Sequence, residues 1–186
     1  MQTTLTSRRF TVDEYYRMAQ AGILAPGERV ELLEGKIVEM AAIGSRHAGC
    51  VNRLNRLFVE ASGNRAVVAI QNPVRLSEIS EPEPDIAILC PRPDHYADAH
   101  PDPREVLLIM EVADTTLDLD RLVKARLYAE AGIAEYWLVD LPGERVEVYR
   151  EPSGKGYREV TAHQRGEVLR PLGLPGVEVA VDAVLP

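Results

Sequence analysis

The sequence PDIAIL, residues 84–89, and the sequence VLLIMEVA, residues 106–113, specify the centre of the fold. Both are apolar runs of β-strand length, and each carries one carboxylate near an end, Asp85 and Glu111. A helical pattern that contains Lys124 follows the second run and stops before Gly132. A carboxylate beside a buried strand is costly unless a metal ion, a cation or hydrogen-bond donors compensate it. What compensates these two acids is therefore the central question about this chain.

The remaining segments predict helices and strands around these runs. A capping box at Thr11–Glu14 opens a helix that runs to about Ala21. Short strands on either side of Glu34 and Gly35 predict a β-hairpin. Further on, the pattern predicts a helix over 46–61 and strands over 66–71, 135–140 and 145–149. This order is typical of an α/β (α+β) fold, a mixed β-sheet flanked by helices with an N-terminal helix and β-hairpin.

Length and composition predict one domain over residues 1–186, with a core of about 10–150 and a peripheral β-rich extension over 151–186. The net charge of −8 argues against a passive, high-affinity DNA-binding module, because such modules are usually basic. It does not exclude a nuclease, whose acidic site is partly neutralised by metal ions. No apolar run approaches the ~20 residues of a membrane span, and the N-terminus shows no signal-peptide pattern, so we expect a cytoplasmic protein.

The helix that follows Glu111 places Asp120, Lys124 and Tyr128 on one face, since residues four apart are neighbours. We expect this face to point inward and Lys124 to reach Glu111. A structural ion pair, Glu111–Lys124 or Asp120–Lys124, explains the pattern equally well.

Several other polar residues have two interpretations. His47 lies on the apolar stripe of its helix, where a satisfied, partly buried histidine is favoured over a role at a site. Gln71, at a strand end, is a weaker candidate for a site neighbour. His95 and His100, in the long loop 91–104, are interpreted as surface residues rather than metal ligands. The glutamates in the loop 77–84 are interpreted as a solvated charge run.

Five segments together resemble the Uma2 family of restriction endonuclease-like proteins, which belongs to the PD-(D/E)XK nuclease superfamily. They are VELLEGKIV (30–38), PDIA (84–87), EVADTT (111–116), DRLVK (120–124) and YAEAGIAEYWLVD (128–140). The resemblance implies a restriction endonuclease-like fold and a Mg²⁺- or Mn²⁺-dependent endonuclease that hydrolyses phosphodiester bonds, with DNA as the substrate.

The resemblance also implies roles for individual residues. Asp85 and Glu111 correspond to the two acids of the superfamily motif, and Glu31 to an N-terminal acid of the family, so all three are expected metal ligands. The motif's lysine would stand two residues after Glu111, where this chain has Ala113. Lys124 takes its place, so Asp85, Glu111 and Lys124 are the expected catalytic residues. Apart from the resemblance, His47, Gln71 and Asp120 are candidates for site neighbours.

Two other functions remain open from the sequence. One is a catalytically idle relative, a homo-oligomeric binding or structural module on the same fold. The other is a metal-dependent hydrolase of a small phosphoester. A homodimer is also expected, because the alternating segment 144–150 could form an exposed edge that pairs with a second copy.

Overall fold

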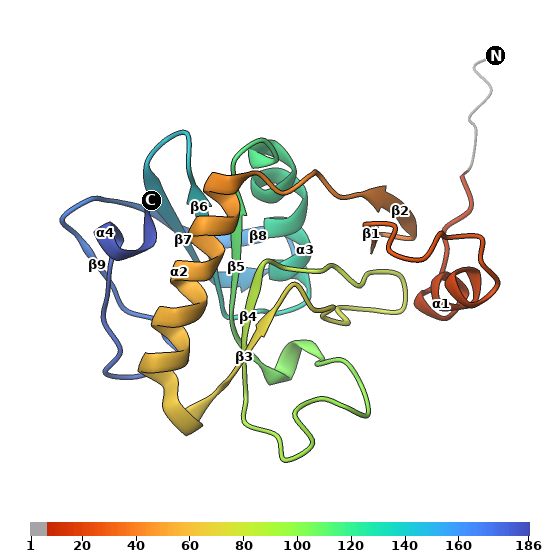
Figure 1. The fold of residues 1–186 in the computed structure, drawn as a ribbon, viewed down its shortest axis with the longest axis horizontal. Coiled ribbons are helices and arrows are strands. Elements are labelled where there is room, and N and C mark those ends of the chain that lie inside the picture. Colours follow the sequence, from red (N-terminus) through yellow and green to blue (C-terminus); the bar gives the residue numbers. More distant parts are fainter. Residues whose placement is uncertain (1–6) are drawn as a thin grey trace.

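A computed structural model describes residues 7–186, and residues 1–6 of the predicted domain lie outside the described part (Figure 1). Its centre is a mixed six-stranded sheet in the order β3-β4-β5-β6-β7-β8, in which only β5 and β6 are parallel. The strands are β3 (Val67–Ile70), β4 (Ile86–Leu89), β5 (Val106–Ala113), β6 (Glu135–Asp140), β7 (Arg145–Ser153) and β8 (Gly156–Gln164). The predicted mixed sheet flanked by helices is therefore confirmed.

Each face of the sheet has its own hydrophobic core. Met110 and Val112 point toward helix α2 (Ser45–Ser62), whereas Ile109 and Ala113 point toward helix α3 (Ala125–Glu130). Because side chains alternate along a strand, Glu111 enters the α3 side, and it is only 3% exposed. The strand register therefore places this carboxylate under the helix that follows it.

Helix α2 is the longest helix and is strongly amphipathic. Its apolar stripe of Cys50, Val51, Leu54 and Phe58 is buried against the sheet, and its arginines are exposed on the other side. Neither α2 nor any other helix within residues 7–186 is long and apolar enough to cross a membrane.

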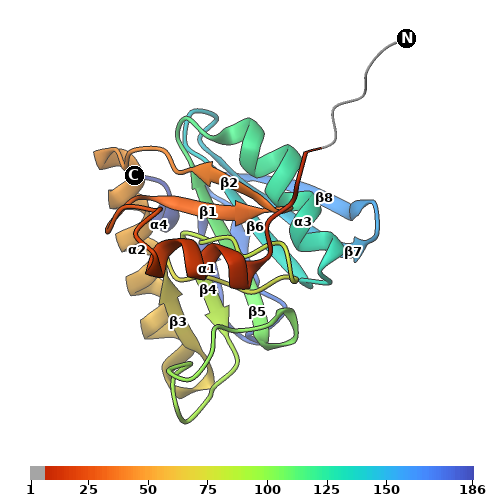
Figure 2. The same ribbon diagram turned by 90° about the vertical axis from the view of Figure 1, so that its right-hand side faces the viewer.

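The N-terminal helix and hairpin pack beside the sheet, as Figure 2 shows. Helix α1 (Val12–Gln20) begins at the predicted capping box of Thr11 and Glu14. Strands β1 (Val30–Leu33) and β2 (Lys36–Glu39) pair antiparallel. All four residues of β1 are buried, because the loop before β4 covers it and the Glu81 N–H donates to the Leu32 carbonyl at 2.8 Å. Glu31 is thus a buried carboxylate in the middle of a strand.

The expectation of a peripheral extension over 151–186 is wrong for most of this segment. The segment forms β8, the short strands β9 (Val168–Leu169) and β10 (Val179–Ala180), and helix α4 (Val181–Val184). Its apolar residues are buried in the α2-side core and include Leu169, Leu174, Val177, Val181 and Val184. Glycine and proline break the segment into pieces too short for a periodic pattern, so the sequence did not indicate that these residues cover the sheet.

The predicted exposed edge over 144–150 is also wrong. Strand β7 lies between β6 and β8 and is hydrogen-bonded to both. The edges of the sheet are β3 and β8 instead. The homodimer stays a prediction, without the support of that edge.

Candidate functional site

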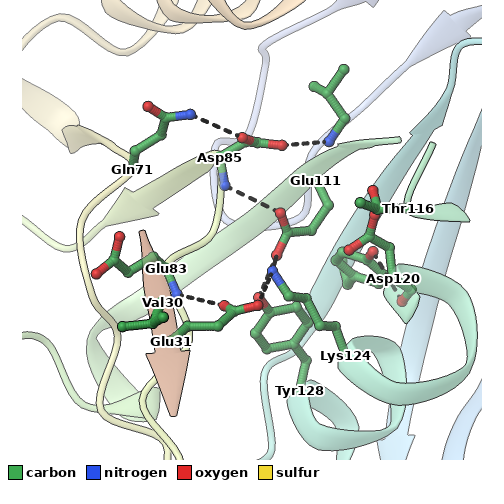
Figure 3. Close-up of polar contacts among 12 residues, drawn as sticks. Val30, Glu31, Gln71, Glu83, Asp85, Glu111, Thr116, Asp120, Lys124 and Tyr128 are labelled. Atoms are coloured by element: carbon green, nitrogen blue, oxygen red, sulfur yellow. Dashed lines mark hydrogen bonds and ion pairs between the residues drawn. The ribbon is translucent and has the colours of Figure 1, made fainter. Parts of the chain in front are cut away.

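Glu31, Asp85, Glu111 and Lys124 line one cavity of about 390 Å³ (Figure 3). The Lys124 amine lies 3.0 Å from Glu111 Oε1 and 3.1 Å from Glu31 Oε1. Asp85 joins this group through its backbone N–H, which donates to Glu111 Oε2 at 3.2 Å. Residues far apart in the sequence thus meet at one place, as expected from their pattern.

The helix that carries Lys124 begins with a π-helical turn, η3 (Leu119–Lys124), before α3. Asp120, Lys124 and Tyr128 all point inward, and each is at most 5% exposed. The shared face is therefore confirmed, although an α-helix was expected throughout. π-turns of this kind occur frequently at functional sites. Asp120 lines the same cavity and accepts a hydrogen bond from the Thr116 hydroxyl at 2.5 Å.

Glu111 is the most heavily compensated acid of the site. Its Oε1 accepts hydrogen bonds from Lys124 and from the Tyr128 hydroxyl, the latter at 2.7 Å. Burial raises the pKa of Glu111 to about 8, with nearby acids adding to the shift and Lys124 opposing it. Burial alone would lower the pKa of Lys124, but Glu111 and Glu31 raise it above its ordinary value. Lys124 therefore stays protonated.

Asp85 is held by three donors. Its Oδ2 accepts from the Val112 N–H at 2.9 Å and lies 2.9 Å from His47 Nε2, and its Oδ1 accepts from Gln71 Nε2 at 3.3 Å. Gln71 has a left-handed backbone with φ of 50°, which is uncommon for a residue with a side chain. The hydrogen bond to Asp85 raises the pKa of His47, although burial opposes the shift. Both predicted neighbours, His47 and Gln71, thus contact Asp85 directly.

The expected solvated run of glutamates is wrong for Glu81 and Glu83. Glu81 is 3% exposed and accepts a hydrogen bond from the Tyr16 hydroxyl at 2.5 Å. Glu83 lines the cavity, and its N–H donates to Glu31 Oε2 at 3.1 Å. Burial and the charge of Glu31 raise the pKa of Glu83. The two-residue spacing of Glu83 and Asp85 is a sequence signal for their shared cavity, because residues two apart in an extended segment lie on one side.

The loop histidines take no part in the site. Neither His95 nor His100 is among the residues that line the cavity. His100 stacks on Tyr16, with the two ring centroids 6.4 Å apart. Both histidines are exposed, which agrees with their interpretation as surface residues.

The donor set of the cavity suits a cation. Acidic side chains in its lining outnumber the two basic ones, Arg29 and Lys124; they are Glu31, Glu39, Glu83, Asp85, Glu111, Asp114 and Asp120. Asp85 Oδ1 and Glu111 Oε2 each accept one hydrogen bond and keep a further lone pair. Carboxylate oxygens are the ligands that Mg²⁺ prefers.

The three predicted ligands do not form a ready-made metal site. Among residues 7–186, no three His, Cys, Asp or Glu side chains are arranged so that they could hold an ion together. Glu31 and Glu111 both bind Lys124 instead. The Asp85 N–H joins Asp85 directly to Glu111, and each of the two carboxylates keeps an oxygen with free acceptor capacity, so this pair fits a divalent ion.

We expect the stability of the metal-free protein to fall as pH rises from about 5 to 8. A carboxyl whose pKa is raised by folding binds more protons in the folded chain than in the unfolded chain. Its contribution to the free energy of unfolding is therefore present below its unfolded pKa and is lost as the pH rises to its folded pKa. Glu111, with a pKa near 8, dominates this loss, at up to about 1.4 kcal/mol per pH unit. Urea unfolding at several pH values measures the slope, and Glu111→Gln should flatten it. A slope unchanged by that substitution would contradict the assignment to Glu111.

Comparisons with known proteins agree with this fold. The sequence profile of the Uma2 family, described as "Putative restriction endonuclease", matches residues 12–182. The crystal structure of a putative nuclease belonging to DUF820 from Anabaena variabilis superposes with a TM-score of 0.76. That chain is 16% identical in sequence, and the superposition covers 94% of this chain and 97% of the other. No curated protein sequence matches the chain.

Proposed function

The chain belongs to the Uma2 family of restriction endonuclease-like proteins, and on this premise we propose that it is a divalent-metal-dependent endonuclease acting on phosphodiester bonds in DNA. One observation carries the proposal: Asp85, directly before β4, and Glu111, on the antiparallel neighbour β5, face one acid-rich cavity together with a buried, protonated lysine. A family match indicates a nuclease-like protein, and this juxtaposition supports a site at which a nuclease could act.

Asp85 and Glu111 would hold Mg²⁺ or Mn²⁺ through their free acceptor positions. A divalent ion bound there lowers the pKa of a bound water and stabilises the charge that develops on the phosphate. Val112, His47 and Gln71 keep the Asp85 carboxylate in place with three hydrogen bonds. Glu31 holds Lys124, so its predicted role as a third ligand finds no support in the contacts.

Lys124 supplies the positive charge of the site. An ammonium group has three hydrogen-bond donors, and Glu31 and Glu111 take two of them. The third is free to donate to a phosphate oxygen or to orient a water molecule as a compact point charge. Because the two glutamates fix the amine from both sides, this charge needs no reorganisation when the substrate arrives.

Plasmid nicking tests the proposal directly. We expect the purified protein to nick supercoiled plasmid with Mn²⁺ or Mg²⁺ and to lose this activity when a chelator removes the ion. Activity that is unchanged in excess chelator would contradict the metal dependence. Absence of nicking with either ion would contradict the proposed function.

A specific observation also favours the idle homo-oligomeric module. Each carboxylate of Glu31, Asp85 and Glu111 already accepts hydrogen bonds from the protein. The Glu111–Lys124 contact is also what a purely structural ion pair predicts. A protein that binds no Mn²⁺, nicks no plasmid and forms an oligomer in light scattering would support the module over the nuclease.

A further inference from the structure

The candidate cavity has little free positive charge with which to hold a polyanion. Lys124 is bound between two glutamates and His47 contacts Asp85, which leaves the exposed Arg29 as the remaining basic side chain in the lining. Proteins bind nucleic-acid backbones mainly by neutralising phosphates with lysine and arginine. A nuclease of this charge, −8 overall, therefore needs a local basic surface outside the cavity.

Many arginines of the chain cannot supply that surface, because carboxylates already neutralise them. Arg92 pairs with Asp94 and Glu105, Arg121 with Asp140 and Glu147, and Arg150 with Glu135. Arg46 and Arg53 differ from these. They donate only to backbone carbonyls, of Leu141 at 3.4 Å and of Leu185 at 3.1 Å, and neither forms an ion pair within the described chain.

Arg46 and Arg53 are both exposed on α2 and lie outside its buried stripe. They are seven residues apart, so they lie on the same side of the helix, roughly 10 Å apart along its axis. Arg56 lies one turn beyond Arg53 and pairs with Glu60, but both side chains are more than 60% exposed, so this ion pair is weak. We call the surface formed by Arg46, Arg53 and Arg56 the α2 ridge.

The α2 ridge begins at the edge of the cavity. Gly44 and His47, on either side of Arg46 in the sequence, both line the cavity. In Figure 1, α2 runs in front of the sheet, away from the loop that joins it to β2. A strand of phosphates that enters the cavity would thus meet Arg46 first and Arg53 further along.

We propose that the α2 ridge binds the phosphate backbone of the nucleic acid next to the phosphodiester that occupies the cavity. This inference rests on the proposed function, because it assumes a nucleic-acid substrate at the cavity. Arg46 and Arg53 are free of carboxylates, and their separation along the helix lets each contact a different phosphate of a repeating anion. The inference assigns these guanidinium groups to backbone phosphates, and phosphate contacts contribute affinity and position rather than sequence preference.

Charge reversal on the ridge tests this inference. In an Asp85→Asn background, which removes cleavage from the measurement, we compare Arg46→Glu/Arg53→Glu with Arg158→Glu for binding to a labelled DNA oligonucleotide. Arg158 is the matched control, because it is exposed, forms no ion pair in the described chain, and lies on β8, the edge strand at the opposite end of the sheet from β3, which α2 contacts. We expect the double substitution to weaken binding at least about 30-fold and to lower the slope of log K against log salt by about 2. The control should lose less than about 3-fold.

Arg46→Lys/Arg53→Lys separates charge from local structure, since lysine keeps the charge while changing the contacts to the carbonyls. Affinity within about 3-fold of the parent is expected. Equal losses of DNA affinity in the ridge variant and in the Arg158 control would overturn the inference. It would also be overturned if the ridge variant bound DNA normally but lost an oligomeric state that the wild-type protein has.

Wild-type nicking in the presence of Mn²⁺ separates the two proposals. If nicking persists and the ridge variant binds DNA normally, only the ridge is wrong; if nicking and DNA binding are both absent, the proposed function is wrong as well.

Discussion

Lys124→Met is expected to destabilise the protein by about 3–5 kcal/mol at pH 8, because it leaves Glu31 and Glu111 buried without their cation. It should also reduce nicking by at least about 100-fold, since the free donor of the amine is lost from the cavity. Methionine fills much of the same volume, so a cavity is not the cause. Urea unfolding measures the first effect, and the plasmid assay measures the second.

The cost should be smaller at pH 5. A buried carboxylate that has lost its cation can take up a proton, and this costs less free energy near the pKa that the carboxyl has in the unfolded chain. Arg126→Met is the control on the same helix, where the arginine pairs with Glu34 and Glu130 in a partly exposed position. That control should cost at most about 1 kcal/mol at either pH. A Lys124→Met protein as stable as the wild type at pH 8 would show that the amine does not compensate the two acids.

Asp85→Ala is expected to abolish nicking, by at least about 100-fold, and to weaken Mn²⁺ binding, since it removes one of the two proposed ligands. It also leaves the buried Val112 N–H without its acceptor, which costs about 1–3 kcal/mol of stability. Asp85→Asn keeps an oxygen for that N–H and removes only the charge. Both variants should lose nicking, and Asp85→Asn should do so with a smaller change in stability.

Glu39→Gln is the matched control for Asp85. Glu39 lines the same cavity but is exposed, and it forms no ion pair among the described residues. Removing its charge should change nicking by less than about 3-fold. If Glu39→Gln and Asp85→Asn lose activity equally, the cavity acts through its total charge and Asp85 has no special role. Full activity in Asp85→Asn would remove Asp85 from the proposed site.

The central features of the fold could be predicted because they follow from local patterns. The apolar runs around Asp85 and Glu111 form neighbouring strands. Asp120, Lys124 and Tyr128, which are four residues apart, share an inward face as predicted, even though part of their helix is a π-turn. The π-turn itself has no sequence signal of the kind that capping residues give. It is identified only by its backbone hydrogen bonds.

What could not be predicted depends on contacts between distant segments. Glu83 looks solvated in the sequence, yet strand β1 packs against its loop and leaves it half-buried, with its N–H bound to Glu31. Residues 151–186 looked peripheral, but Val181 and Val184 pack onto α2 and complete its core. Strand β7 is internal because β8 pairs with its free side. The local sequence pattern of a strand does not indicate which other strands pair with it.

Calorimetric titration of the metal-free protein with Mn²⁺ at pH 7, in two buffers with different heats of ionisation, tests the central claim most directly. We predict saturable binding that releases about one proton, because Glu111, with a pKa near 8, must lose its proton to act as a ligand. The same titration of Asp85→Asn should show binding at least about 10-fold weaker. Absence of saturable binding to the wild-type protein would contradict the account and would mean that Lys124 and the other protein donors compensate these acids by themselves.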